Sequence, residues 1–152
     1  MLTPRRKAAL LAMEGRYDDA AALLQAAVGS APADAGAHLE LGRLHFEWPQ
    51  RAPGHEAAAE AAFARAAELD KKSELPALLL GHVQRRRGLK AAARTSYREA
   101  LRRNPGSAPA REALDLLDVG RARRFAFAAL AAAALLFIAG AGLLVHAVRL
   151  PA

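Results

Sequence analysis

The chain has 152 residues and no cysteine, which excludes disulfide bonds and cysteine-ligated metals. Its length suits one domain with an appendage, and its abundance of alanine, with only 5% aromatic residues, favours an all-α fold. Residues 1–124 carry 21 basic and all 15 acidic side chains, a net charge of +6. An excess of this size suits an anionic lipid surface, an acidic partner or nucleic acid, and does not choose among them.

The first predicted element is a helix that begins after Thr3. Thr3 before Pro4 is a typical helix start, and Asp34 and Ser73 are expected to cap two later helices. The basic residues near the N-terminus are followed by an apolar run, Ala8–Met13, of only six residues. A secretory signal needs about 7–15 apolar residues, so this segment is interpreted as a helix.

Small and large side chains then recur along residues 1–107. The first and third copies are 73 residues apart and share four of six residues. The middle copy is displaced by 34 residues on its first helix and by 39 on its second, and its extra residues fall in a turn at 48–54 that contains proline and glycine. The three series are Gly15, Tyr17, Ala20, Leu24, Ala27 and Pro32; Leu41, Gly42, Ala59, Phe63 and Ala66; and Leu80, Gly81, Gly88, Lys90, Ala93, Tyr97, Ala100 and Pro105.

The small residues of these series let two helices approach closely, the large ones fill the space beside them, and the prolines end the second helices. The pattern resembles the tetratricopeptide repeat (TPR) family. The resemblance implies an all-α solenoid of helical hairpins, with repeats at about 1–34, 35–73 and 74–107. It also implies a role in binding proteins or peptides.

A capping helix is expected after the third repeat, because the last hairpin of such a stack must cover its apolar face. Residues 108–119 have the required amphipathic pattern. The apolar positions are Ala110, Ala113, Leu114 and Leu117, and the charged positions are Arg111, Glu112, Asp115 and Asp118.

Residues 125–148 are predicted to form a transmembrane helix, followed by a short tail at 149–152. These 24 residues contain no charged side chain. As a helix they are about 36 Å long, enough for a hydrocarbon core of about 30 Å. The alternative is a buried helix of a soluble bundle, but such a helix normally has a polar face, and here no polar side chain occurs before His146.

The flanks of this segment predict its orientation. Arg121, Arg123 and Arg124 precede it, whereas only Arg149 follows. Positively charged flanks stay on the cytoplasmic side, so we expect a single-pass, tail-anchored protein with a cytoplasmic repeat domain at 1–124. The richness in alanine and arginine favours a bacterial inner membrane.

The sequence carries no recognisable catalytic set. It has no Gly-x-Ser-x-Gly motif, no phosphate-binding loop and no His-Glu-x-x-His motif. His38 and His45 are seven residues apart on one predicted helix, so their backbones are about 10 Å apart, too far to share a metal by themselves. We therefore expect no enzymatic activity and no metal or cofactor, which leaves binding.

In the resembled family, the first helices of the repeats line a concave surface that takes peptides or partner helices. Carried over to this sequence, that surface is apolar and basic, which suits a partner with acidic and apolar residues. The alternative is that some of these side chains pack against the next repeat. The predicted groove residues are Arg5, Arg43, Phe46, His82, Arg85 and Arg86.

Some members of that family grip a C-terminal carboxylate with a set of Lys, Asn and Arg residues. This chain has Arg5 at the first of those positions. The set does not continue, because the next positions hold Ala9, Glu40, Leu75 and Leu79. Binding of chaperone tails by such a clamp is therefore not expected.

A stripe of basic residues recurs every four positions and therefore lies along one face of a predicted helix. We call these residues the basic stripe: Lys90, Arg94, Arg98 and Arg102, with Arg87 and Arg103 nearby. A solvated outer face is one interpretation, and contact with anionic lipid headgroups is another. Nucleic acid is the third and least favoured, because the stripe lacks interleaved aromatic side chains.

Three functions follow from these features. The first is a membrane-anchored adaptor or scaffold that binds a protein partner at the cytoplasmic face. The second is an assembly or biogenesis factor for a membrane or envelope complex, in which the membrane helix itself makes specific contacts. The third is a tethered, basic nucleic-acid binder.

Overall fold

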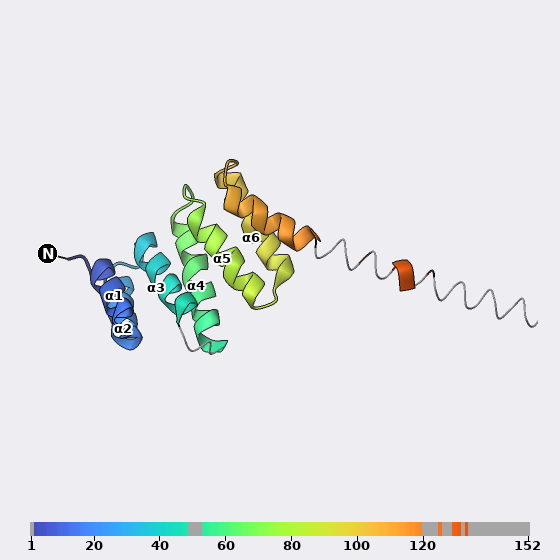
Figure 1. Ribbon diagram of the computed structural model, residues 1–152. Coiled ribbons are helices and arrows are strands. Elements are labelled where there is room, and N and C mark those ends of the chain that lie inside the picture. The colour runs from blue at the N-terminus through green and yellow to red at the C-terminus, as the bar shows by residue number, and fades with distance from the viewer. Residues whose placement is uncertain (1, 49–52, 120–124, 126–128, 132, 134–152) are drawn as a thin grey trace, which may run out of the picture. The chain divides into compact units, whose positions relative to one another are not determined.

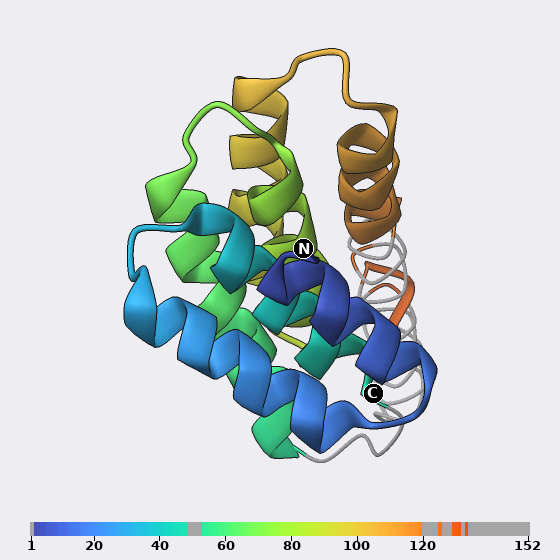
Figure 2. The ribbon, with the colours of Figure 1, turned by 90° about the vertical axis from the view of Figure 1, so that its left-hand side faces the viewer.

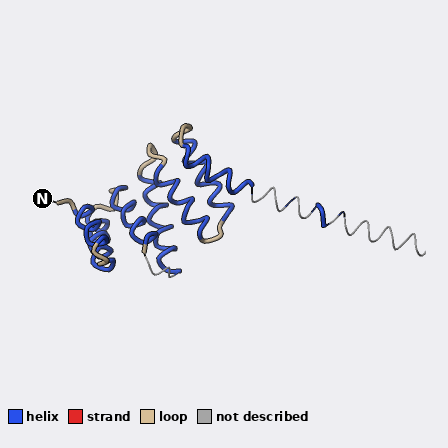
Figure 3. The backbone as a smooth tube through the Cα atoms, in the orientation of Figure 1, coloured by secondary structure: helices blue, strands red, loops and turns tan. Residues whose placement is uncertain are grey.

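The computed structural model describes residues 2–48, 53–119, 125, 129–131 and 133 of the chain. Within these ranges every regular element is a helix, and no strand occurs (Figure 3). The chain divides into two compact units, Met1–Leu114 and Asp115–Ala152. The first unit contains three helical hairpins that follow one another in chain order (Figure 1). The predicted all-α repeat architecture is therefore confirmed for this unit.

Each hairpin consists of two helices joined by a short connection, and α1 and α2 lie antiparallel, side by side (Figure 2). Residues 108–114 of the same unit are also helical, and the helix continues to residue 119. The bounds are α1 Pro4–Met13, α2 Tyr17–Ser30, α3 Ala35–Glu47, α4 Pro53–Leu69, α5 Leu75–Arg86 and α6 Lys90–Arg103.

Two of the three predicted helix caps are present. The Thr3 hydroxyl accepts a hydrogen bond from the Arg6 N–H at 3.4 Å. The Asp34 carboxylate accepts one from the Gly36 N–H at 2.8 Å, as the first helical turn requires. Ser73 lies one residue before Glu74, the N-cap of α5, but its hydroxyl still accepts a hydrogen bond from the Leu75 N–H at 3.2 Å. Ser73 belongs to the preceding turn, where its N–H donates to the Asp70 carboxylate at 3.1 Å.

Glycine ends the first helix of the first and third repeats. Gly15 and Gly88 have φ angles of 78° and 79°, in the left-handed region that side chains disfavour. In α1 the Arg16 N–H reaches the Leu11 carbonyl at 2.9 Å, and the Gly15 N–H reaches the Ala12 carbonyl at 3.0 Å. The same two bonds recur after α5. These glycines thus let each hairpin reverse direction while the last carbonyls of its first helix stay bonded.

The hairpins are held together by a small residue facing a large one. A Cβ added to Gly42 would lie 2.6 Å from the Phe63 ring, and one added to Gly81 would collide with the Tyr97 ring. Phe63 and Tyr97 are fully buried. In the first hairpin the corresponding position is Ala8, which shares a core cluster with Leu24. Ala8 is larger than the glycine of the other two hairpins, and its partner Leu24 is smaller than Phe63 or Tyr97.

A chain of polar contacts crosses from α4 through α5 to α6. The Gln84 amide nitrogen donates to the Glu60 carboxylate at 3.2 Å, and the Ser96 hydroxyl donates to the Gln84 amide oxygen at 2.7 Å. Glu60 also pairs with Arg87. Gln84 and Ser96 are buried, so these bonds satisfy polar groups that would otherwise be costly to bury.

The helix at residues 108–119 has the predicted amphipathic pattern. Ala110, Ala113 and Leu117 are buried, whereas Arg111 and Glu112 are exposed. In the second unit, residues 125, 129–131 and 133 are helical as well.

In the part of the chain that is described, none of the helices has the length and apolarity needed to cross a membrane. The predicted membrane helix at 125–148 lies mostly outside the described residues.

Candidate functional site

A groove of about 420 Å³ lies between α1 and α3, the first helices of the first two repeats. Its floor is apolar and its rim is charged. The periodicity of the two helices explains this, because residues three, four, seven or eight apart share one helix face. The lining residues are Arg5, Ala8, Ala9, Ala12, Met13, Tyr17, Leu24, Glu40, Arg43, Leu44 and Glu47.

The two ends of this groove, called here the α1–α3 groove, carry opposite charges. Arg5 lies at the start of α1, with its Nη1 4.0 Å from Asp34 Oδ1, and its guanidinium lies against Gly36 at the start of α3. Met13 and Glu47 are the last residues of the same two helices, and Met13 is 85% exposed. The groove therefore has Arg5 at a basic end and Glu47 at an acidic end, with an apolar floor and the pair of Glu40 and Arg43 between them.

Arg43 stands part-way along the groove and forms an exposed ion pair with Glu40 at 3.8 Å. Its side chain is 48% exposed and that of Arg5 is 47% exposed. Long, exposed pairs of this kind contribute only about 0–1 kcal/mol. Both guanidinium groups can therefore change partner at little cost.

Phe46 and Arg86, two further predicted groove residues, pack on each other away from the α1–α3 groove. The Arg86 guanidinium carbon lies 3.9 Å from the centre of the Phe46 ring, and its Nη1 donates to the Phe46 carbonyl at 2.9 Å. Arg86 Nε also lies 2.7 Å from a Glu56 carboxylate oxygen. These contacts tie α3, α4 and α5 together, so both side chains have a structural role.

His82 and Arg85, the remaining predicted groove residues, lie beside Tyr97. The Tyr97 hydroxyl is 3.1 Å from His82 Nδ1. Burial, followed by the nearby charge of Arg85, lowers the pKa of His82. Burial also raises the pKa of the Tyr97 hydroxyl. The predicted set thus separates into a pair in the α1–α3 groove, a pair between α3 and α5, and a pair near the α5–α6 interface.

The basic stripe lies on α6 and is only partly available to a partner. Lys90 and Arg98 are exposed. Arg102 is engaged by Glu99, to which its Nε and Nη2 donate at 2.7 and 2.6 Å. These bonds, followed by one from Arg103, lower the pKa of Glu99 to about 2.

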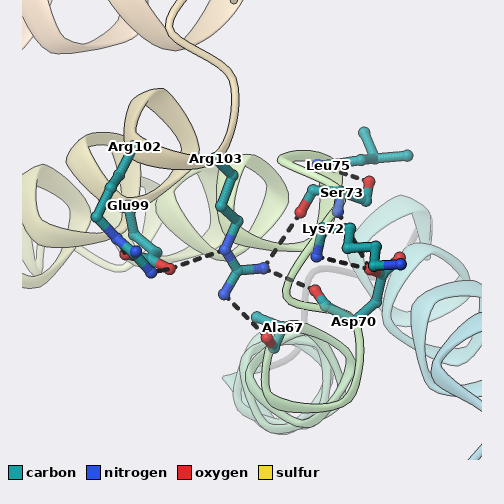
Figure 4. Close-up of polar contacts among 8 residues, drawn as sticks. All are labelled: Ala67, Asp70, Lys72, Ser73, Leu75, Glu99, Arg102 and Arg103. Carbon is teal, nitrogen blue, oxygen red and sulfur yellow. Dashed lines mark hydrogen bonds and ion pairs between the residues drawn. The ribbon is translucent and has the colours of Figure 1, made fainter.

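Arg103, expected to extend the stripe, is instead a structural residue (Figure 4). Its side chain is 7% exposed. It donates to the carbonyls of Ala67 at 2.9 Å and Asp70 at 2.8 Å, and a third bond reaches the Ser73 carbonyl at 3.2 Å. The last carbonyls of a helix have no hydrogen-bond donors within the helix. At the end of α4, the Arg103 guanidinium supplies such donors.

Met13 and Glu47 line the groove but were not predicted as groove residues. The signal was present in the sequence, since Met13 follows Arg5 by eight residues and Glu47 follows Arg43 by four. Such spacings place each pair on one helix face. The predicted surface was basic and apolar, and the acidic end supplied by Glu47 makes it mixed in charge.

Comparison with known proteins places this geometry in context. No family model matches the chain, and no curated protein matches its sequence. Solved structures do match it. The crystal structure of MamA is 20% identical with a TM-score of 0.66, and the match covers 76% of this chain and 64% of that one. The fold is TPR-like.

Two further TPR-like structures were determined with peptides. The first TPR domain of Spaghetti (RPAP3), bound to the HSP90 peptide SRMEEVD, is 17% identical with a TM-score of 0.68, covering 78% of this chain and 90% of that one. The Yersinia enterocolitica chaperone SycD, in complex with a peptide of the translocator YopD, is 18% identical with a TM-score of 0.66, covering 78% and 92%. This chain spans less than two thirds of the MamA chain and most of the other two.

Proposed function

We propose that this chain is a protein-interaction adaptor that holds an extended or helical segment of a partner in the α1–α3 groove. The observation that carries the proposal is the groove itself, with its apolar floor between a basic and an acidic end. Peptide-bound structures with the same TPR-like fold support a partner of this kind.

The lining of the groove specifies the chemistry of the segment. Ala8, Ala9 and Ala12 leave room for one large apolar side chain over the floor. Burying such a side chain contributes about 1.5–3 kcal/mol. Arg5 and Arg43 then favour an acidic residue on one side of that anchor, and Glu47 favours a basic residue on the other.

The exchange of ion pairs makes this binding feasible. Arg5 and Arg43 pair with Asp34 and Glu40 across 4.0 and 3.8 Å in exposed positions. A partner carboxylate that accepts closer, charge-assisted hydrogen bonds from either guanidinium replaces a weak contact with a stronger one.

Photo-crosslinking tests the groove directly. Ala9 is exposed and lines the groove, so a photo-crosslinking residue at this position should capture the partner, whose segment is then identified by mass spectrometry. The same residue at Ala91, exposed on α6, is the matched control. Equal capture of the same segment from both positions would contradict the proposal.

The captured segment, made as a synthetic peptide, gives the quantitative test. Arg43→Glu should weaken its binding about tenfold or more, because a charge-assisted hydrogen bond is replaced by repulsion. Ala9→Trp should block binding by filling the groove, whereas Ala91→Trp should not. Unchanged affinity in Arg43→Glu and Ala9→Trp, with helical content preserved, would refute binding in the groove.

We also propose that residues 125–148 tether this domain to a membrane and that the domain faces the cytoplasm. The support comes from the sequence: 24 residues without a charge, preceded by Arg121, Arg123 and Arg124 and followed by Arg149 alone. A tether restricts the partner to proteins that reach the membrane surface.

A further inference from the structure

Two histidines from different helices face each other at the end of the second hairpin. His45 lies near the end of α3 and His55 near the start of α4, and their Nδ1 atoms are 3.1 Å apart. Both side chains are partly buried. One Nδ1–H can donate to the other nitrogen, and the tautomers of the two rings decide which of them is the donor.

Trp48 holds the two imidazoles in this arrangement. Its ring stacks on His55 with centroids 4.2 Å apart, and on His45 with centroids 5.7 Å apart. The other side of the cluster is closed by Tyr17 of α2, whose ring centre is 5.3 Å from that of Trp48. Trp48 itself is 9% exposed. Packing on both rings fixes the positions of the two nitrogens before any ligand arrives.

The distance of 3.1 Å between the two Nδ1 atoms is close to the distance between two ligand nitrogens on one transition-metal ion. Zinc bonds imidazole nitrogen at about 2.0–2.1 Å, and tetrahedral geometry then separates two ligand nitrogens by about 3.3 Å. We propose that His45 and His55 form a two-histidine site for a divalent first-row transition metal, Zn²⁺ or Cu²⁺. Imidazole suits both ions.

The chemistry of the pair allows the ion to enter. Both Nδ1 lone pairs must face the metal, so the imidazole that carries a proton on Nδ1 moves it to Nε2. No group of three or more potential ligand residues occurs in the described part of the chain, so the proposed site has two protein ligands.

A metal at this position joins the two helices of the second repeat. The connection between α3 and α4 is the lengthened one of the three repeats. An ion bridging His45 and His55 cross-links that connection, and binding to the folded state alone raises stability with ion concentration. Metal content thereby tunes the repeat whose first helix forms one wall of the α1–α3 groove.

The fluorescence of Trp48, the only tryptophan in the chain, tests the site. Cu²⁺ added to the full-length protein should quench this fluorescence saturably, at about one ion per chain, because the ion sits beside the indole. Zn²⁺ should compete with this quenching and raise the melting temperature. Because Cu²⁺ binds such ligands more tightly than Zn²⁺, quenching that never saturates, or that a large excess of Zn²⁺ does not reduce, would overturn the proposal.

Single substitutions separate the site from other histidines. His45→Gln and His55→Gln should each raise the half-quenching concentration by about tenfold or more. His38→Gln removes another histidine of the same helix and should leave the titration unchanged. Circular dichroism verifies that each variant is folded. Wild-type quenching in folded His55→Gln would show that the ion binds elsewhere and would refute the site.

Discussion

Gly81 allows α5 and α6 to pack closely only because it has no side chain. A Cβ at this position would overlap the ring of Tyr97, which is fully buried and bonded to His82 through its hydroxyl. We expect Gly81→Ala to lower the free energy of unfolding by about 1–3 kcal/mol, the usual cost of overpacking a core. Urea denaturation followed by circular dichroism measures this.

Gly29 provides the matched control. It lies in α2, is exposed, and has no neighbouring atom within 4 Å of the point that an added methyl carbon would occupy. Gly29→Ala should therefore raise the stability by about 0.5–1 kcal/mol, because alanine loses less backbone freedom in a helix. Equal effects of the two substitutions would show that close packing at Gly81 is not decisive.

Glu99 links the stability of the fold to pH. Hydrogen bonds from Arg102, then from Arg103, lower its pKa to about 2 in the folded state. An unfolded glutamate titrates at about 4.3. The contribution of Glu99 is therefore complete above that value and is lost as the pH falls towards 2. Glu99→Gln should flatten the fall in melting temperature over this range.

A second variant tests whether the hydrogen bonds from Arg102 cause this acid sensitivity. Arg102→Gln removes the first donor to Glu99 and should reproduce part of the flattening. Melting temperatures measured from about pH 2 to pH 7 at constant ionic strength compare the three proteins. If the melting temperature of Glu99→Gln fell with decreasing pH as steeply as that of the wild type, the result would contradict this account.

At the scale of elements, Arg103 completes the end of α4. It donates to the carbonyls of Ala67, Asp70 and Ser73 from a side chain that is 7% exposed. Arg103→Met keeps the apolar stem but leaves these carbonyls without their donor, which should cost about 1–3 kcal/mol. Arg102→Met removes only an exposed ion pair and should cost much less.

Chemical denaturation of Arg103→Met and Arg102→Met measures how much stability each variant loses. Arg102 and Arg103 are neighbours in sequence and both contact Glu99. A difference in stability therefore reports the carbonyl contacts of Arg103. Loss of the same stability in both variants would mean that the bond to Glu99 accounts for the whole effect.

The helices were predictable because their signals are local. The recurring small and large residues and the caps at Thr3 and Asp34 lie within a few residues of the features they determine. Arg103 was expected to extend the basic stripe because its carbonyl partners lie 30 to 36 residues away in the sequence, where the spacing on one helix cannot reveal them. The position of Arg103 on α6 does not reveal that its side chain contacts the end of α4 and the turn that follows it.

The groove was predictable only in part. Arg5 and Arg43 line it, and their part in binding a partner stays a prediction. Phe46 and Arg86 were expected on the same surface. Periodicity cannot distinguish a half-buried ring that packs on a guanidinium from a ring on a binding surface. Similarly, the contact of His45 with His55 depends on how the chain closes the second hairpin, and no spacing rule gives that.

At the scale of the whole molecule, membrane attachment is a separate prediction. If residues 125–148 span a bilayer, the full-length chain should remain in the membrane pellet after alkaline carbonate washing and enter solution only with detergent. The apolar length, about 36 Å as a helix, is the physical reason. Immunoblotting of the fractions measures the distribution.

A chain cut after residue 119 is the control for this fractionation. It keeps the described helices of the first unit and the basic stripe, and it lacks the apolar segment. The shortened chain should move to the supernatant. If it also stays in the pellet through a carbonate wash, attachment depends on the repeat domain and the predicted span is not required.

The contacts that run from Glu60 through Gln84 to Ser96 have a mechanical consequence. Sliding α5 by one turn along its neighbours would move the Gln84 amide away from both Glu60 and Ser96. The buried Gln84 and Ser96 side chains would then lack their hydrogen-bond partners. The second and third hairpins consequently lock in a single alignment. We therefore expect any flexing that accommodates the proposed partner to be concentrated nearer the N-terminus, where α1 meets α3.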